Sequence, residues 1–150
     1  MFNRILVPLD GSDVAEAILS EVEELASRIS AEVILLEVLP ETGVLPTTAH
    51  QEYNKAKQYL DDIVQKLKNQ GIKATATIRY GKPAEEIVDY AQTNGVDLIA
   101  MCTHGRSGVS RWVFGSVAEK VLRGTSLSIL LCRAPGVSAY GLPLITDSEP

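Results

Sequence analysis

The stretch from Cys102 to Ser116, C-T-H-G-R-S-G-V-S-R-W-V-F-G-S, lies between a short apolar run and a segment with helical periodicity. Three of its residues are glycine and two are arginine. A strand that leads through such a loop into a helix suits a phosphate group. Glycine lets the backbone approach a ligand closely, and the first turn of a helix presents amides that lack a helical partner. This stretch therefore predicts a strand–loop–helix unit that binds a phosphorylated small molecule.

Apolar runs and helical patterns alternate along the rest of the chain in the same way. From the spacing of apolar residues we expect strands near 5–9, 32–39, 72–78, 98–101 and 127–132, and helices near 14–29, 53–67, 83–91 and 117–122. Strands that alternate with helices are joined by right-handed crossovers, which give a parallel sheet covered on both faces. The sequence thus predicts a single α/β domain with a doubly wound sheet of five mainly parallel strands.

Ligands of such sheets bind beyond the carboxyl ends of the strands, where the strand order reverses. Asp10, which follows the first apolar run, and the 102–116 loop are therefore the segments of interest. Asp10 has two interpretations: a turn former whose carboxylate accepts local amides, or a group that contacts a ribose, a base or a cation. The presence of the second loop favours the functional interpretation.

Side chains of the loop also have structural alternatives. Ser116 and Glu119 have the spacing of a capping box, in which the serine hydroxyl satisfies the helix's own amides. Arg106 and Arg111 place positive charge beside a helix N-terminus, which favours an anion, although arginines in polar loops are often only solvated.

The composition of the chain argues against several functional classes. Apolar residues make up 45% and charged residues 22% of the 150-residue chain, and the net charge is −5. This acidic balance argues against nucleic acid or an anionic membrane as the partner. Only five apolar residues lie between Arg4 and Asp10, too few for a signal peptide, and no run approaches the ~18 apolar residues of a spanning helix. We expect a cytoplasmic protein. Cys102 and Cys132 each end an apolar run and are interpreted as buried free thiols, with a disulfide or metal pair as the alternative.

Motifs for several kinds of chemistry are absent from the sequence. His104 and His50 have no further ligand at metal-binding spacing, so no metal site made of side chains is expected. The chain has no G-x-S-x-G elbow, no lysine-bearing P-loop, and no G-x-G-x-x-G after the first apolar run. No residue is therefore assigned a catalytic role.

Three segments together resemble the universal stress protein family over about residues 1–133. They are I-L-V-P-L-D-G-S at 5–12, V-I-L-L-E-V-L at 33–39 and T-H-G-R-S-G-V-S-R-W-V-F-G-S-V-A-E-K-V-L at 103–122. The nucleotide-binding branch of that family is known by a G-x₂-G-x₉-G-[ST] signature. Here Gly105, Gly115 and Ser116 match its last three positions, whereas Cys102 occupies the first glycine position. Because a thiol is small, we expect this departure to tune affinity rather than abolish binding.

The resemblance implies a Rossmann-like sheet of the adenine nucleotide alpha hydrolase type, with strand order 3-2-1-4-5. It also implies an ATP site, with ADP or AMP as alternatives, in which Mg²⁺ or Mn²⁺ is held by phosphate oxygens. The implied nucleotide-binding residues run from the adenine and ribose end to the phosphate end: Pro8, Asp10, Val38, Met101, Cys102, Gly105, Arg106, Gly115, Ser116 and Val117.

The resemblance further implies a homodimer that pairs through the last strand, from Ser128 to Cys132. An apolar edge strand is otherwise an aggregation hazard, so this pairing also has a physical motive. Residues 134–150 are expected to form a tail that is poorly ordered or packs on the dimer partner. The implied function is that of an ATP-binding, nucleotide-responsive stress or regulatory factor with at most slow hydrolysis. The alternatives are an interaction module that binds no nucleotide and a slow phosphohydrolase.

Overall fold

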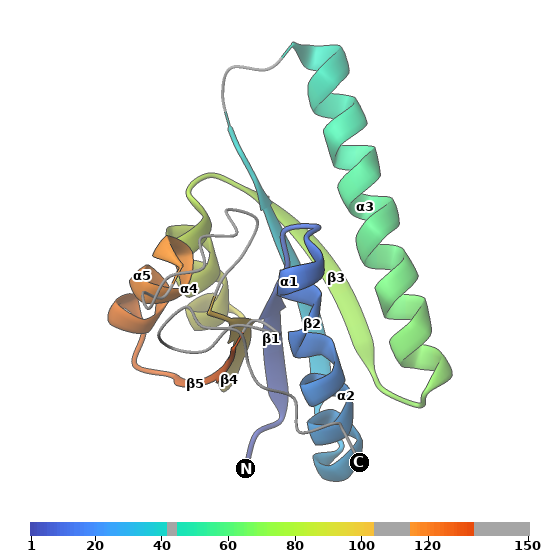
Figure 1. The fold of residues 1–150 in the computed structure, drawn as a ribbon, viewed down its shortest axis with the longest axis vertical. Coiled ribbons are helices and arrows are strands. Elements are labelled where there is room, and N and C mark those ends of the chain that lie inside the picture. The colour runs from blue at the N-terminus through green and yellow to red at the C-terminus, as the bar shows by residue number, and fades with distance from the viewer. Residues whose placement is uncertain (42–44, 104–114, 134–150) are drawn as a thin grey trace, which may run out of the picture.

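The computed structural model describes residues 1–41, 45–103 and 115–133. Its centre is a five-stranded sheet in which every neighbouring pair is parallel (Figure 1). The order is β3-β2-β1-β4-β5, so the sheet order 3-2-1-4-5 is confirmed. The strands are β1 (Arg4–Pro8), β2 (Glu32–Leu39), β3 (Ala74–Tyr80), β4 (Leu98–Cys102) and β5 (Ser128–Cys132).

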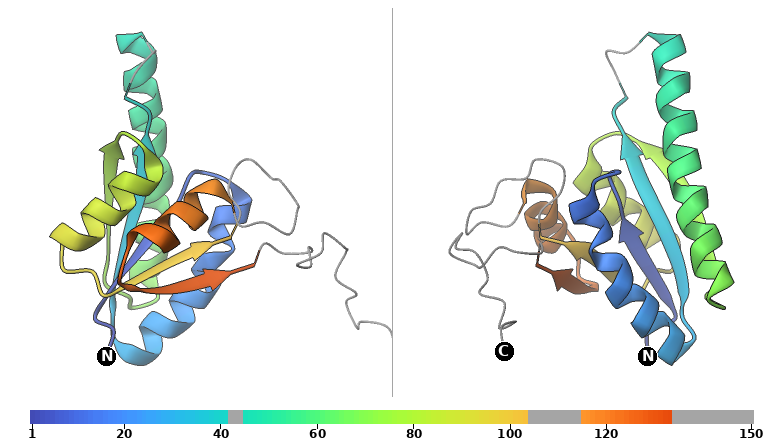
Figure 2. Two further views of the ribbon diagram at one scale, coloured as in Figure 1. Left: turned by 90° about the vertical axis from the view of Figure 1, so that its left-hand side faces the viewer. Right: turned by 45° about the vertical axis from the view of Figure 1, so that its right-hand side comes forward.

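Helices cover both faces of this sheet, as the alternation of patterns predicts (Figure 2). One face carries α1 (Asp13–Glu16), α2 (Ile18–Ile29) and α3 (Pro46–Asn69), and the other carries α4 (Pro83–Thr93) and α5 (Ser116–Gly124). No helix in the described part of the chain is long and apolar enough to cross a membrane.

Two apolar layers follow from the alternation of side chains along each strand. Val7 of β1 packs with Val22 and Leu60 of the first helical layer, whereas the neighbouring Leu6 packs with Ile87 on the second. Both faces of β1 are buried, which explains why its sequence is apolar without interruption. The sheet order places β1 at the centre, between β2 and β4.

The first two helical segments differ in detail from the sequence-based expectation. The helix expected over 14–29 is divided at Ala17, although that residue keeps right-handed helical dihedrals. The helix expected from residue 53 begins at Pro46 instead. Its first buried residue is Ala56, and its amino-terminal part extends beyond the end of the sheet (Figure 1). Because no side chain of α3 before Ala56 is buried, the sequence of that part carries no apolar period to detect.

Polar contacts hold the amino end of the sheet together. The Asp97 carboxylate accepts hydrogen bonds from the amides of Asn3, at 2.9 and 3.1 Å, and of Arg4, at 3.1 Å. The Arg4 guanidinium in turn donates to the Asn94 carbonyl, and its Nε lies 3.4 Å from Oε2 of Glu32. We call Asn3, Arg4, Glu32, Asn94 and Asp97 the amino-end clasp. It ties β1 to the start of β2 and to the turn before β4.

Candidate functional site

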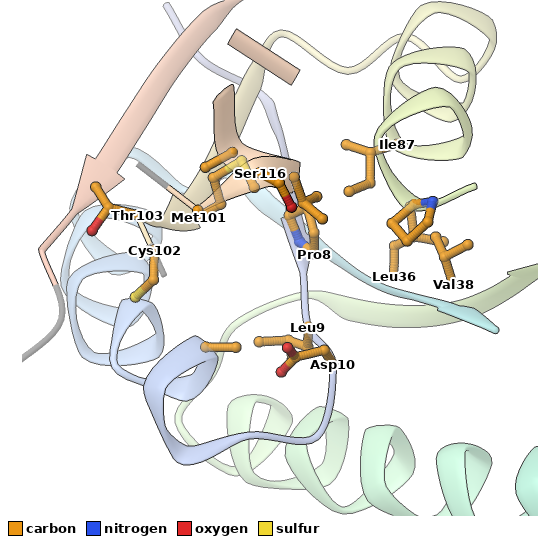
Figure 3. A pocket seen from close by; sticks show the side chains of 15 residues that line it. Pro8, Leu9, Asp10, Leu36, Val38, Ile87, Met101, Cys102, Thr103 and Ser116 are labelled. Carbon is orange, nitrogen blue, oxygen red and sulfur yellow. The ribbon is translucent and has the colours of Figure 1, made fainter. Parts of the chain in front are cut away.

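A pocket of about 270 Å³ opens at the carboxyl end of the sheet, over β1 and β4 (Figure 3). This is the point where the chain reverses its direction of travel across the sheet, since β1 pairs with β2 on one side and β4 on the other. The lining comes from strand ends and from the starts of helices: Pro8, Leu9, Asp10, Ala15, Leu36, Val38, Pro83, Ile87, Met101, Cys102, Thr103, Gly115, Ser116, Val117 and Ala118.

One side of the pocket is apolar. Leu36 and Val38, both on β2, lie beside Ile87 of α4, with Pro8 next to them (Figure 3). Their alternation along β2 places Leu36 and Val38 on the same face, toward α4 and α5. Such a wall offers no hydrogen bond from its side chains and suits an uncharged, flat group.

Asp10 lies at the pocket's lower edge in Figure 3 and already has a structural task. Its Oδ1 accepts a hydrogen bond from the Ser12 amide at 2.9 Å, which closes the turn after β1. The Ser12 hydroxyl then accepts from the Ala15 amide at 3.1 Å and caps α1. The turn-forming interpretation of Asp10 is therefore correct, and the carboxylate also forms part of the pocket wall. Contact between Asp10 and a ligand stays a prediction.

Negative charge gathers behind Asp10. Burial raises the pKa of the Tyr59 hydroxyl on α3, and the charges of Glu16, Glu37 and Asp10 act in the same direction. Glu37 is a buried carboxylate near the end of β2. The Asp10 side of the pocket is therefore an unfavourable place for an anion.

The opposite side of the pocket is the first turn of α5. Gly115 is the N-cap and Ser116 is the first helical residue, so the capping box expected from Ser116 and Glu119 is wrong by one position. Glu119 instead contacts Arg123 at 3.1 Å, one turn further along the helix. The Ser116 side chain is exposed and its hydroxyl points toward the pocket (Figure 3).

The start of α5 borders the pocket, which Gly115, Ser116, Val117 and Ala118 line. The Gly115 amide donates to the Thr103 carbonyl, which connects the end of β4 to α5. The amides of Ser116, Val117 and Ala118 belong to the first turn, where an α-helix supplies no acceptor. The helix dipole adds partial positive charge at the same place. This end of the pocket therefore favours an anion.

Cys102 lines the pocket without filling it. Its sulfur points toward the helices α1 and α2 rather than into the pocket, and it lies close to the Ile18 backbone (Figure 3). Burial, the neighbouring Cys132 and Asp10 raise the pKa of Cys102 to about 11. The thiol is thus neutral at physiological pH and adds no charge to the wall.

Every predicted binding residue that the structure describes lies around this one pocket: Pro8, Asp10, Val38, Met101, Cys102, Gly115, Ser116 and Val117. Gly105 and Arg106 fall outside the described residues, as does Arg111. Sequence reasoning missed Leu36, Pro83 and Ile87. Pro83 follows β3 at a first helical position, so its place at the carboxyl edge of a parallel sheet was available as a signal. Within the described ranges, no three His, Cys, Asp or Glu side chains come together as a metal site.

Fold and pocket together define a doubly wound α/β protein with a pocket at the switch point of its sheet. A sequence model of a protein family, described as the universal stress protein family, matches residues 1–133 of this chain. The chain belongs to the universal stress protein family.

Individual members of the family align with this chain over most of their length. Universal stress protein YxiE of Bacillus subtilis is 31% identical over 148 residues, covering 89% of this chain and all (100%) of that protein. MJ0577 of Methanocaldococcus jannaschii is 30% identical over 155 residues, and its solved structure matches with a TM-score of 0.75 over 89% of this chain and 96% of that one. A universal stress protein from Archaeoglobus fulgidus, solved in complex with dAMP, shares the fold with a TM-score of 0.68 at 21% identity, covering 87% of this chain and 97% of that one.

Proposed function

We propose that this protein binds ATP in the pocket between β1 and β4, with adenine against the β2 wall and the phosphates at the start of α5. The observation that carries the proposal is the contrast between the two sides of the pocket. Leu36, Val38 and Ile87 offer an apolar surface, whereas α5 presents the amides of its first turn. A nucleotide has the same division into a flat base and an anionic chain.

Electrostatics supports one orientation of the ligand over the reverse. Phosphates near Asp10 would meet the negative charges of Asp10, Glu16 and Glu37, all of which act on Tyr59. Phosphates at α5 would meet the amides of Ser116 and Val117 and the positive end of a helix dipole. The ribose then lies near Asp10, Met101 and Cys102.

A divalent ion would accompany the nucleotide rather than occupy a site of its own. Mg²⁺ commonly keeps several waters and binds through substrate phosphates, so Mg²⁺ or Mn²⁺ would be held mainly by phosphate oxygens. ADP and AMP fit the same apolar wall and would differ only at the α5 end. The dAMP complex of the Archaeoglobus relative supports adenine nucleotides as the ligand class.

The outer edge of β5 is the proposed interface of a homodimer. Within the described residues, β5 pairs only with β4, so its other side presents unpaired backbone groups. Ile129, Leu130 and Leu131 are half-buried there, although they form an apolar strand. Pairing with a second copy would complete the backbone hydrogen bonds and cover these side chains.

The functional role follows from binding rather than from chemistry. A ligand that binds only the native form at 100 times its dissociation constant adds about 2.7 kcal/mol to stability. We infer a cytoplasmic, dimeric regulatory or protective factor that responds to nucleotide, with at most slow ATP hydrolysis. The competing interaction module without nucleotide rested on Cys102 at a glycine position. The Cys102 sulfur points toward α2, so Cys102 lines the pocket without its sulfur projecting across it, which favours the nucleotide-binding hypothesis.

Calorimetric titration of nucleotide-free protein tests the proposal. MgATP should bind with saturation and raise the melting temperature clearly, and adenosine should do so only weakly, because adenosine lacks the phosphates that α5 receives. Equal shifts for the two ligands would contradict the phosphate end of the site. No saturable heat with MgATP, ADP or AMP, from protein with an intact circular dichroism spectrum, would refute nucleotide binding altogether.

A further inference from the structure

Cys102 and Cys132 are direct neighbours across the sheet. They are the last residues of β4 and β5, and they form a register pair in the parallel ladder. Side chains paired in register point to the same face of a sheet, and both cysteines pack in the layer that contains α2. Adjacent strands lie about 4.7–4.9 Å apart, which falls inside the 4.4–6.8 Å range of Cα separations in disulfides.

The two thiols differ in access. Cys102 is buried in the pocket wall, whereas Cys132 is partly exposed on the edge strand. Both are reduced in this structure. A pair of this kind has an outer sulfur that a small reagent can reach while the edge of β5 is unpaired, and an inner sulfur that only its neighbour can reach.

Position at the strand ends leaves room for a bond to form. Among the described residues, Cys102 and Cys132 are the last register pair of the β4–β5 ladder, and a single backbone hydrogen bond between the two strands follows them. The Thr103 amide donates to the Cys132 carbonyl at 2.8 Å, and the Thr103 carbonyl accepts from Gly115. A change at Cys132 therefore reaches the start of α5 through two backbone hydrogen bonds.

We propose that Cys102 and Cys132 are a redox pair that forms an intrachain disulfide by exchange with a low-molecular-weight disulfide of the glutathione type. The Cys132 thiolate attacks the small disulfide, giving a mixed disulfide on Cys132 and releasing one small thiolate. The Cys102 thiolate then attacks Sγ of Cys132 and releases the second. Two protein thiols are oxidised, one small disulfide is reduced to two thiols, and the two cysteine protons pass to the released thiolates.

The surroundings make this exchange slow at neutral pH and faster in alkali. Burial raises the pKa of both thiols, and the negative charges of Asp10 after β1 and Glu21 on α2 oppose ionisation of Cys102 and Cys132 respectively. The Ile18 backbone acts in the opposite direction on Cys102, and an ionised Cys132 further disfavours ionisation of Cys102. Since only a thiolate attacks, the rate should rise about tenfold per pH unit below these pKa values.

Oxidation of the purified full chain tests the proposal. Reduced protein is incubated with oxidised glutathione at mildly alkaline pH, quenched with acid, alkylated with iodoacetamide in denaturant, and digested with trypsin without reductant. We expect a disulfide that joins the peptides carrying Cys102 and Cys132, with monomer mobility on a non-reducing gel. Dithiothreitol should restore two alkylatable thiols.

Single variants separate the roles of the two sulfurs. Cys102→Ala should leave glutathione stably bound at Cys132, whereas Cys132→Ser should leave Cys102 unmodified, because its thiol is buried. If Cys102→Ala fails to fold, the Cys132→Ser result and the wild-type peptide map still decide. Glutathione retained on wild-type Cys132, a Cys132–Cys132 link between two chains, or two unmodified thiols after prolonged incubation would each overturn the proposal.

Discussion

The two ends of the sheet are built from different chemistry. At the amino end, the clasp of Asn3, Arg4, Glu32, Asn94 and Asp97 joins the strands through charged and backbone groups. At the carboxyl end β1 and β4 separate around a largely apolar pocket, whereas β1 and β2 remain paired. Stability is thus concentrated where no ligand is expected, and the pocket can bind a guest without being responsible for holding the sheet together.

The first prediction breaks the clasp. Asp97→Ala removes the acceptor of the exposed Asn3 amide and of the partly buried Arg4 amide. Hydrogen bonds to a charged group each contribute about 1.5–3 kcal/mol, so the free energy of unfolding should fall by about 3 kcal/mol. Urea denaturation measures this loss, and Asp97→Asn, which keeps one acceptor oxygen, should lose about half as much. A change of nucleotide affinity beyond about twofold in the folded variant would contradict the separation of the two ends.

The second prediction fills the pocket. Val38→Trp places a large ring against Leu36 and Ile87, where adenine is proposed to lie. Affinity for MgATP should fall on the order of 100-fold, equivalent to about 2.7 kcal/mol. Calorimetric titration measures the loss. Leu122→Trp is the matched control, because Leu122 is an exposed apolar residue of α5 outside the pocket lining, and its affinity should match the wild type.

The third prediction concerns pH at the carboxyl end. Burial raises the pKa of Cys102 to about 11 from its usual value of 9.0. Between these values the unfolded chain has lost the thiol proton while the folded chain retains it, so stability falls as pH rises. The difference in unfolding free energy between wild type and Cys102→Ala should shrink by about 2 kcal/mol from pH 8 to pH 11. Tyr59 is present in both proteins, so its contribution to the difference cancels. A difference that stays constant over this range would show that Cys102 is not buried as described.

The fourth prediction separates the two tasks of Asp10. Asp10→Asn keeps an oxygen that can accept the Ser12 amide and removes the charge, whereas Asp10→Ala removes both. If the carboxylate binds the ribose, Asp10→Asn should weaken MgATP binding about tenfold, or about 1.4 kcal/mol, with little change in stability. Asp10→Ala should lose similar affinity and also about 1 kcal/mol of stability. Unchanged affinity in Asp10→Asn would leave Asp10 as a turn former only.

The smallest effect on stability is expected for an ion pair that belongs neither to the clasp nor to the pocket. Glu119 and Arg123 form an exposed pair one turn apart on α5, at 3.1 Å. Pairs of this kind contribute about 0.3–0.5 kcal/mol, so Glu119→Gln should change the melting temperature by a degree or two at most. A larger loss in thermal unfolding would indicate that α5 depends on this pair and would weaken the comparison of the two ends.

Much of the fold was predictable because each buried strand is marked in the sequence by a short run of apolar residues. Neither face of β1 meets water, so its sequence shows no polar alternation, and β3 alternates because it lies at the edge. The start of α3 at Pro46 was not predicted, because no residue of this helix before Ala56 is buried and its sequence there shows no apolar period. Apolar periodicity in a sequence reflects burial, so the exposed amino-terminal part of α3 shows no such periodicity.

The site was predictable to a different degree. The pocket lining from Pro8 to Val117 follows from strand ends in a parallel sheet, and Gly115 marks the helix start. The register of the cap was not predictable, because Gly115 and Ser116 are both acceptable N-caps and only tertiary context selects one. The pairing of Cys102 with Cys132 likewise depends on the register of β4 against β5, which neither strand carries in its own sequence.

The central place of β1 has a consequence for how the chain is made. Ile5 pairs with Val33 on one side but with Leu98 on the other, so one edge of the first strand has no partner until most of the polypeptide exists. At about 5–20 residues per second, a ribosome takes on the order of 5–20 s to supply it. Until β4 follows, β1 is therefore the open, apolar edge of the nascent β3-β2-β1 sheet, and the pocket, which needs β4 and the start of α5, is completed only late in synthesis.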